Sequence, residues 1–340
     1  MRYTGNKLYV EDLEETINQT LDFEYFRNKK VLVLGATGLI GSFLVDCLLH
    51  ANATRNMKIH VTAVSRSIAR LEECFGSETA ELLFLEKDVS VLEDAIQADV
   101  IIHAASGAYP QAFRVFPVET MLANMLGTYR VMEIARRNSQ CRVLYVSSGE
   151  VQEEVDHLSV RACYPISKQA GETLCLSYIQ EYGTDAVIAR PCHTFGANAT
   201  VKDNRAAAQF ISCAAEGEDI VLNSAGTQVR SFMYVADCVS GLLTAISCGT
   251  AGKVYNVSSD ETCSIRQFAE KCAALVQRKV LNREANEEEQ AEASPIRGQI
   301  LDNVGLKSLG WSPIYSIENG IAHSIRIQQN WRKSEWENTI

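Results

Sequence analysis

The sequence lacks the features of a membrane protein or a secreted protein. No apolar run approaches the ~20 residues that a membrane-spanning helix needs. Residues 1–28 are charged and polar, which predicts neither a signal peptide nor a membrane anchor. Low-complexity tracts and internal repeats are also missing, and 340 residues are enough for one large domain or two smaller ones. We therefore expect a folded protein that works outside the membrane.

Positive charge is scarce as well. The chain has 32 Lys and Arg residues against 42 Asp and Glu residues, a formal net charge of −10. A surface with this balance repels the phosphate backbone of nucleic acids, so the sequence predicts no nucleic-acid partner. An anionic ligand would need a local basic pocket.

The cysteines lack the pairing expected of disulfides or zinc sites. There are eleven, an odd number, and no two form a C-x-x-C pair. Cys47, Cys141 and Cys175 lie in apolar segments, as small buried hydrophobic residues do. We predict a protein of the reducing cytoplasm, without disulfides and without a bound metal.

Short apolar runs alternate with helical patterns from residue 31 onward. The runs are typical of buried strands and cover residues 31–34, 59–64, 82–85, 100–103, 142–147 and 186–190. The helical patterns cover residues 39–50, 118–138 and 164–182. This alternation predicts βαβ units, and near-continuous apolar strands fit a sheet covered on both faces. The sequence therefore predicts an α/β fold with a Rossmann-type doubly wound parallel sheet.

The flanking regions are different. Residues 12–27 have the pattern of an amphipathic helix ahead of the core. After residue 190 the pattern is less regular, with helices predicted over 203–216, 266–277 and 316–327 and strands over 220–222 and 254–257. We predict three parts, namely a helical extension (1–28), a dinucleotide-binding domain that includes the catalytic residues (29–190), and a smaller, mixed lobe that mainly binds substrate (191–340).

A glycine-spaced turn follows the first apolar run. Gly35, Gly38 and Gly41 have the spacing G-x-x-G-x-x-G and open the helix predicted from residue 39. Glycines in this position permit a tight turn and a close approach of the backbone, and the helix N-terminus faces a pyrophosphate. A purely structural turn would explain the glycines alone. Because the turn joins a strand to a helix, we predict a dinucleotide site that also includes Thr37, Leu39 and Ile40.

The second strand ends without the acid that commonly binds the adenine ribose. The position reads Ser65-Arg66. An arginine there could accommodate a 2′-phosphate, which would favour NADP over NAD, or it could lie over the adenine face. Asp88 and Val89, after the third strand, suit a contact with the adenine edge, and a helix N-cap is the equal alternative for Asp88.

Tyr164 and Lys168 are four residues apart at the start of a predicted helix, so both side chains lie on one face. A tyrosine with its ordinary pKa of about 10 is a poor base near neutrality. A nearby ammonium and a nicotinamide cation would lower the pKa of the phenol. Ser148 ends the preceding strand and is placed to bind the hydroxyl being oxidised. A surface helix pair would explain Tyr-x-x-x-Lys alone, but the upstream glycine turn favours catalysis.

At this point the chain resembles the extended short-chain dehydrogenase/reductases, also called NAD-dependent epimerase/dehydratases. The matching stretches cover Gly35–Gly41, His103–Ser106, Pro117–Thr120, Asn124 with Gly127-Thr128, and Tyr164 with Lys168. The resemblance implies an NAD(P) cofactor and a nucleotide-diphosphate sugar oxidised at C4. It also implies that Ala104, Ala105 and Ser106 line the cofactor, that Pro191 and Cys192 pass near the nicotinamide, and that Asn124 supports a proton relay. Relatives commonly pair two long helices in a dimer, and residues 118–138 and 164–182 match these helices.

Within the group, several stretches are most similar to UDP-glucuronate decarboxylases. They are 147–151, 160–164, 203–205 and 228–232. The resemblance implies that Glu150 positions the sugar or handles a proton, that Arg230 lies near the sugar or diphosphate, and that Arg205 neutralises phosphate. The alternatives are an exposed glutamate and structural salt bridges. Removal of hydride from C4 of a uronic acid gives a β-keto acid, which loses carbon dioxide readily.

The sequence also departs from that group. Gln152-Glu153 replaces the usual Tyr-Gly, and the segment from Val151 to Tyr164 is shorter. His193 stands where relatives commonly have Asn, and it would donate to a phosphate or sugar oxygen or serve as a structural histidine. Gly149 stands where a 4,6-dehydratase would carry an Asp acid, which argues against elimination of water. Besides decarboxylation, three alternatives stay open, namely C4 epimerisation, NADPH-dependent reduction of a 4-keto-sugar, and a non-catalytic dinucleotide-binding module.

Overall fold

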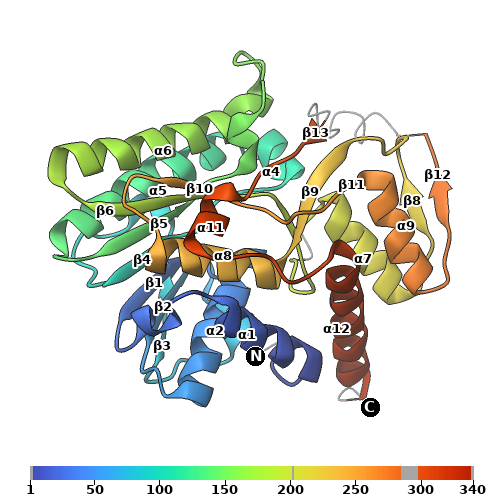
Figure 1. Ribbon diagram of the computed structural model, residues 1–340, viewed down its shortest axis with the longest axis horizontal. Helices are drawn as coiled ribbons and strands as arrows, with labels where there is room; N and C mark the ends of the chain where they lie inside the picture. The colour runs from blue at the N-terminus through green and yellow to red at the C-terminus, as the bar shows by residue number, and fades with distance from the viewer. Residues whose placement is uncertain (1–2, 201–202, 285–297, 338–340) are drawn as a thin grey trace.

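A seven-stranded parallel sheet forms the centre of the protein. The computed structural model describes residues 3–200, 203–284 and 298–337. The strand order is β10-β6-β5-β4-β1-β2-β3 (Figure 1). The bounds are β1 (Lys30–Leu34), β2 (His60–Ser65), β3 (Leu82–Glu86), β4 (Val100–His103), β5 (Arg142–Val146), β6 (Asp185–Pro191) and β10 (Val254–Val257). All six strands predicted before residue 190 are therefore confirmed, together with the doubly wound parallel sheet.

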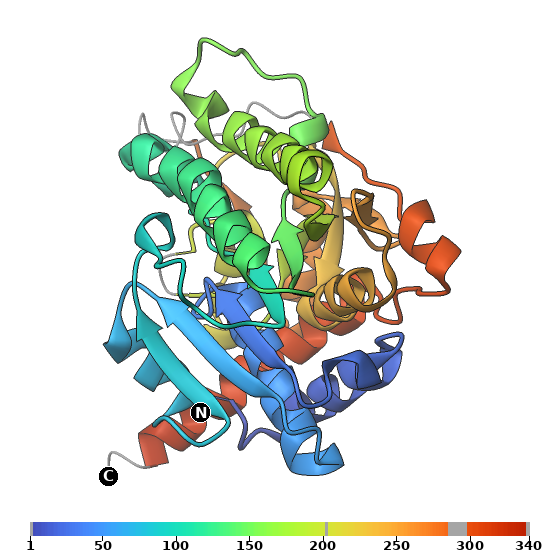
Figure 2. The same cartoon turned by 90° about the vertical axis from the view of Figure 1, so that its left-hand side faces the viewer.

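Helices cover both faces of this sheet (Figure 1). On one face lie α5 (Pro117–Arg137) and α6 (Cys163–Tyr182), which pack against each other (Figure 2). On the other face lie α2 (Leu39–Arg55) and α8 (Val235–Cys248). Strand β1 shows why both faces are apolar, because Leu32 and Leu34 are buried on the α5 side while Val31 and Val33 are buried on the α2 side. Two shorter helices are α3 (Ile68–Phe75), which contacts β2 and β3, and α4 (Pro110–Val115), which contacts α5.

A smaller lobe is built around β9 (Val229–Tyr234). This strand pairs in parallel with β7 (His193–Phe195) and β13 (Gly298–Gln299), and antiparallel with β11 (Thr262–Ser264). A separate parallel pair consists of β8 (Ile220–Leu222) and β12 (Val280–Asn282). The helices of the lobe are α7 (Ala206–Glu216), α9 (Ile265–Leu275) and α12 (Ile317–Glu337), and α11 (Val304–Leu309) lies near β10. The three predicted helices are confirmed with shifted ends.

Two features differ from the sequence-based expectation. Helix α8 was not predicted, and after it the chain returns to the main sheet as β10, beside β6. Residues 235–257 therefore belong to the main sheet and the helices that cover it, although they follow residue 190. Most of α8 is buried, and its polar residues Asp237, Ser240 and Thr244 form hydrogen bonds with residues 19–21 instead of facing solvent. The division into three domains otherwise stays a prediction.

The helix predicted over residues 12–27 begins earlier and ends earlier. It is α1 (Lys7–Gln19), capped by Asn6, and a 3₁₀ turn, η1 (Phe23–Phe26), follows it. This segment is part of the core, because Tyr9, Leu13 and Ile17 are buried against α2 and α8. Asp12 is fully buried and accepts hydrogen bonds from the hydroxyls of Tyr234 and Tyr315. The remaining 3₁₀ turns are η2 (Val89–Val91), η3 (Gly149–Gln152) and η4 (Val160–Ala162).

No helix in the described part of the chain is long and apolar enough to cross a lipid bilayer. All eleven cysteines are free.

Candidate active site

A cavity of about 530 Å³ opens at the carboxyl ends of the parallel strands. Residues that follow β1, β2, β3, β4, β5 and β6 all contribute to its wall, which is where open parallel sheets bind ligands. Every predicted cofactor-binding residue lines it. They are Gly35, Thr37, Gly38, Leu39, Ile40, Gly41, Ser65, Arg66, Asp88, Val89, Ala104, Ala105, Ser106, Tyr164, Lys168, Pro191 and Cys192.

The glycine turn leaves no room for side chains. Gly35 has a φ of +79°, and a Cβ atom on it would lie 2.8 Å from the backbone of Ala104 and Ala105. A Cβ atom on Gly41 would lie 2.2 Å from the carbonyl oxygen of Gly35. Gly38 is the N-cap of α2 and offers no capping side chain, so the first N–H groups of this helix face the cavity. The turn therefore fits the pyrophosphate of a dinucleotide.

The far end of the cavity is lined by Ser65, Arg66, Asp88 and Val89. Asp88 Oδ1 accepts hydrogen bonds from the backbone N–H and the hydroxyl of Ser90, at 2.9 and 2.6 Å. The carboxylate thus caps η2, which was one of the two alternatives for this residue, while it also borders the cavity.

Tyr164 and Ser148 meet at the other end. Tyr164 opens α6 and its ring stacks on Phe113, with 4.6 Å between the ring centroids. The pKa of Tyr164 is raised to about 12, mainly by burial and next by the negative charge of Glu150. A hydrogen bond with Ser148 and the positive charges of Arg205 and Arg161 lower it.

Lys168 is buried one turn further along α6. Its Nζ donates to the carbonyl oxygen of Val146 at 2.7 Å, and burial lowers the pKa of the ammonium to about 7, against the opposing effect of Glu172. The expectation that Lys168 lowers the pKa of Tyr164 is not met in the protein alone. Desolvation of the phenol outweighs the nearby cations, and Lys168 is not one of the groups that lower its pKa.

Glu150 forms an ion pair that the sequence did not reveal. Its carboxylate lies 2.8 Å from the guanidinium of Arg161, and both side chains are mostly buried. The same guanidinium lies 4.4 Å above the ring of Phe113. Glu150 is therefore neither exposed nor unpaired, and Arg161 joins the site. The signal was present, since Arg161 lies in one of the stretches that resemble the decarboxylases.

Asn124 lies behind the site instead of lining the cavity. It is fully buried on α5, and its Nδ2 donates to the hydroxyl of Ser167 at 2.9 Å. Ser167 in turn donates to the carbonyl oxygen of Tyr164. The contact fixes the first turn of α6, and a role in proton relay stays a prediction.

The three predicted substrate residues lie together on the lobe side. Arg205 lines the cavity and is paired with Asp203, with 2.6 Å between Nη2 and Oδ2. His193 lines it too, and burial beside Arg230 and Arg205 holds the pKa of His193 well below its ordinary value. Its Nδ1 is buried and has no hydrogen-bond partner among the described residues. Arg230 is buried on β9, beside the strand that carries His193, and does not line the cavity.

Two further residues were missed. Glu172 accepts hydrogen bonds from the hydroxyl of Ser147 and, at 2.8 and 2.6 Å, from Arg190, which ties α6 to the ends of β5 and β6. Gln299 on β13 lines the cavity and is buried, and its Nε2 has no hydrogen-bond partner within the described ranges. Sequence gave no signal for Gln299, because β13 reaches the site only by pairing with β9.

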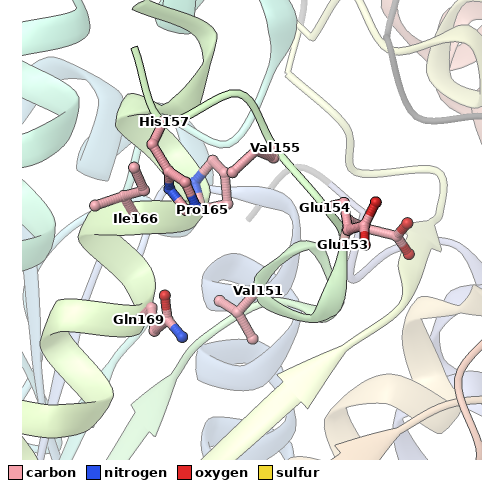
Figure 3. A pocket seen from close by; sticks show the side chains of 8 residues that line it. All are labelled: Val151, Glu153, Glu154, Val155, His157, Pro165, Ile166 and Gln169. Carbon is pink, nitrogen blue, oxygen red and sulfur yellow. The ribbon is translucent and has the colours of Figure 1, made fainter. Parts of the chain in front are cut away.

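A second cavity, of about 440 Å³, lies beside the site. It is bordered by residues 151–157 and by the start of α6, with His157, Pro165 and Ile166 on one side and Glu153 and Glu154 on the other (Figure 3). Burial raises the pKa of Glu153, and Arg230 opposes this. The segment is the one in which Gln152-Glu153 departs from the decarboxylase pattern.

The model of the NAD dependent epimerase/dehydratase family matches residues 31–258. UDP-glucuronic acid decarboxylase 1 of Danio rerio is 30% identical over 316 residues, which cover 88% of this chain and 72% of that protein. UDP-glucuronic acid decarboxylase 3 of Arabidopsis thaliana is 28% identical over 307 residues, covering 86% and 87%. Among solved structures, WbmF of Bordetella bronchiseptica in complex with NAD+ and UDP superposes with a TM-score of 0.73. It is 22% identical, and the superposition covers 92% of this chain and 98% of that one.

Proposed function

Because this chain belongs to the NAD dependent epimerase/dehydratase family, we propose that it oxidises a nucleotide-diphosphate sugar at C4 and decarboxylates it. The substrate we propose is UDP-glucuronate. The observation that carries the proposal is the convergence of Ser148, Glu150 and Tyr164 on the cavity that holds the glycine turn. The similarity to UDP-glucuronic acid decarboxylases over most of the chain supports the same reaction.

The dinucleotide, when bound, supplies a nicotinamide that takes the hydride from C4 and gives it back. The positive charge of the nicotinamide would lower the pKa of the Tyr164 phenol, so that Tyr164 can take the proton of the C4 hydroxyl, which Ser148 orients by a hydrogen bond. The resulting 4-keto acid loses carbon dioxide, and the C5 carbanion, held as an enolate, then takes a proton. Glu150, whose charge is balanced by Arg161, positions the sugar or handles that proton. The ketone is reduced again at C4, so the cycle consumes no external reductant.

His193, Arg205 and Gln299 hold the substrate at the lobe side of the cavity. Arg205 supplies positive charge for the diphosphate. The buried Nδ1 of His193 and Nε2 of Gln299 lack protein partners among the described residues, so an oxygen-rich ligand would satisfy them. Burial, together with the positive charges of Arg230 and Arg205, lowers the pKa of His193 and keeps the imidazole neutral.

The test is incubation of the purified protein with UDP-glucuronate, followed by mass spectrometry of the nucleotide sugar. Loss of the mass of carbon dioxide is the expected result. A new isomer of unchanged mass would assign C4 epimerisation instead, and steady consumption of NADPH with a 4-keto-sugar would assign a reductase. If Tyr164→Phe left the cellular activity unchanged, the protein would be a non-catalytic binding module.

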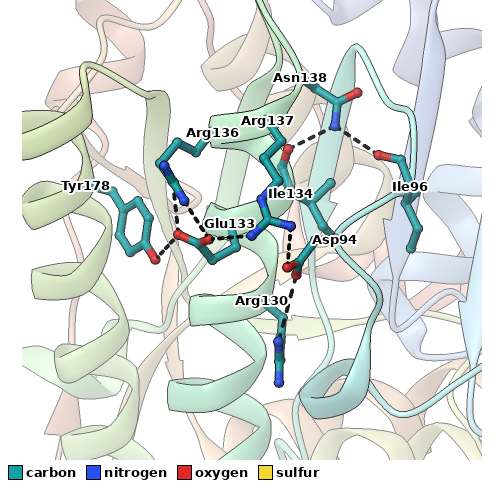
Figure 4. Close-up of polar contacts among 9 residues, drawn as sticks. All are labelled: Asp94, Ile96, Arg130, Glu133, Ile134, Arg136, Arg137, Asn138 and Tyr178. Carbon is teal, nitrogen blue, oxygen red and sulfur yellow. Dashed lines mark hydrogen bonds and ion pairs between the residues drawn. The ribbon is translucent and has the colours of Figure 1, made fainter.

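We also propose a homodimer that uses α5 and α6. Val118, Leu122, Met125 and Tyr129 are each at least 40% exposed, and their spacing of four, three and four residues places them on one face of α5. At one end of this row, Glu133 joins the two helices by accepting from the Tyr178 hydroxyl at 2.8 Å (Figure 4). Such an apolar row is typical of an interface. Sedimentation as a monomer at micromolar concentration would contradict the dimer.

We infer a cytoplasmic location from the eleven free cysteines, which suit a reducing compartment. Cell fractionation tests this inference directly. Recovery of the protein in an oxidising compartment would contradict it.

A further inference from the structure

We propose that the adenosine end of the cavity accepts a 2′-phosphate, so that this protein binds NADP at least as tightly as NAD. The inference does not depend on the proposed sugar reaction, because that cycle returns its hydride and can run with either dinucleotide. It rests on the residues around the carboxyl ends of β2 and β3.

The last residue of β2 is Ser65, at the position where a carboxylate binds the two ribose hydroxyls in NAD-specific sites. Such a carboxylate repels a 2′-phosphate. The hydroxyl of Ser65 is neutral and does not repel a phosphate. It lies 3.2 Å from the hydroxyl of Thr37, which also lines the cavity. Two neutral groups therefore occupy the place where the acid would exclude NADP.

Three cationic side chains surround this place. Arg66 follows β2, Arg70 lies in the first turn of α3, and Lys87 follows β3, and all three line the cavity. The Nε of Arg70 is buried and has no hydrogen-bond partner in the ranges that the structure describes. A phosphate with a charge of about −1.5 to −2 would satisfy this group and attract the other two.

Asp88 lines the same end of the cavity, but its Oδ1 already accepts two hydrogen bonds from Ser90, and the other nearby acids are exposed or held elsewhere. Arg66 lies 3.6 Å from Glu119, but both side chains are more than 60% exposed, and ion pairs in that setting are weak. Lys87 lies 3.5 Å from the exposed Glu93. Glu86 accepts from the backbone N–H of Ile68 at 2.9 Å, so its carboxylate is held at the start of α3.

The bound ligand would replace weak surface contacts by charge-assisted hydrogen bonds. Arginine guanidinium groups bind phosphate oxygens in pairs, and two of the three cations are arginines. An alternative role for Arg66 is stacking over the adenine face. Stacking would favour NAD and NADP equally, since the adenine is common to both. Binding of the 2′-phosphate would favour NADP alone, so the two roles of Arg66 can be distinguished by comparing the two ligands.

The experiment is calorimetric titration of the purified full chain, freed of bound dinucleotide, with NADP+ and with NAD+. The expected result is a Kd for NADP+ equal to or lower than that for NAD+. Arg66→Ala and Arg70→Ala should each weaken NADP+ binding about tenfold to a hundredfold. Binding of NAD+ should change less than about threefold. Ser65→Asp should reverse the preference by weakening NADP+ binding alone.

Arg278→Ala is the matched control, because Arg278 is exposed, carries the same charge, and does not line the cavity. It should leave both Kd values unchanged. Binding of NAD+ more than tenfold tighter than NADP+, or an equal loss for both ligands in Arg66→Ala, would overturn the proposal. Either result would leave the proposed decarboxylation intact, because the product assay does not measure this preference.

Discussion

Asp46 makes the stability of the fold depend on pH in a way that can be calculated. The side chain lies on α2, the helix that begins at the glycine turn, and its Oδ2 accepts from the hydroxyl of Tyr9 at 2.7 Å. Its Oδ1 is buried with no hydrogen-bond partner among the described residues. Burial raises the pKa of Asp46 from 3.8 to about 7, although the Tyr9 bond opposes this.

The raised pKa means that folding favours the protonated carboxyl group. Its contribution is fully present below pH 3.8, the unfolded value, and is lost as the pH rises through about 7. A shift of about three units corresponds to about 4 kcal/mol in all, of which about 2.5 kcal/mol is lost between pH 5 and pH 8. Asp46→Asn cannot ionise, so the free energy of unfolding of this variant should lack that loss.

The assay is urea unfolding followed by circular dichroism at pH 5 and pH 8, for the wild type and Asp46→Asn. The Asp46→Asn substitution itself lowers the free energy of unfolding at both pH values. The informative quantity is therefore how far the difference in unfolding free energy between wild type and variant changes from pH 5 to pH 8. Glu15→Gln is the matched control, because Glu15 is exposed on α1. If the difference between wild type and Asp46→Asn is the same at pH 5 and pH 8, the buried carboxylate does not titrate as argued here.

Three further substitutions test the site. Tyr164→Phe should lower kcat by about 10²- to 10⁴-fold because it removes the acid/base, and an unchanged kcat in the product assay would contradict that role. Gly41→Ala places a methyl group 2.2 Å from the carbonyl oxygen of Gly35, so calorimetry should show loss of dinucleotide binding, whereas tight binding would mean that the turn can open. Gln299→Leu removes an unpartnered buried donor, so it should not lower the melting temperature, but it should raise KM for the nucleotide sugar about tenfold. A KM equal to that of the wild type would show that Gln299 does not contact substrate.

Sequence reasoning located correctly those features whose geometry one short segment determines. The turn from Gly35 to Gly41 and the pair Tyr164 and Lys168 each depend on residues within one turn or one helix face. Strands β1, β4 and β5 were found because they are covered on both faces and are mainly apolar. Helix α8 was missed although Asp237, Ser240 and Thr244 recur at helical spacing, and this polar stripe is buried against residues 19–21.

In the protein alone the pKa of Tyr164 is raised, and the predicted lowering, which includes the effect of a nicotinamide cation, stays a prediction. The spacing of Tyr164 and Lys168 shows that they share a helix face, but it does not show how deeply each is buried. Lys168 instead donates to the carbonyl oxygen of Val146, and desolvation dominates the pKa of both groups. Burial is a property of the packed protein, so charge spacing alone cannot give the sign of such a shift.

The three cations at the adenosine end could not be brought together from the Ser65-Arg66 motif alone, because their arrangement depends on how β2 and β3 pair. Sequence alone offered Arg66, with two competing roles. The parallel register places Ser65 opposite Glu86, so Lys87 lies beside Arg66, and the first turn of α3 brings Arg70 to the same wall. One arginine is compatible with stacking on adenine, whereas three cations around a hydroxyl favour a phosphate. The proposed preference for a 2′-phosphate therefore depends on the register of two strands, and disruption of that register should remove it even with all three cations present.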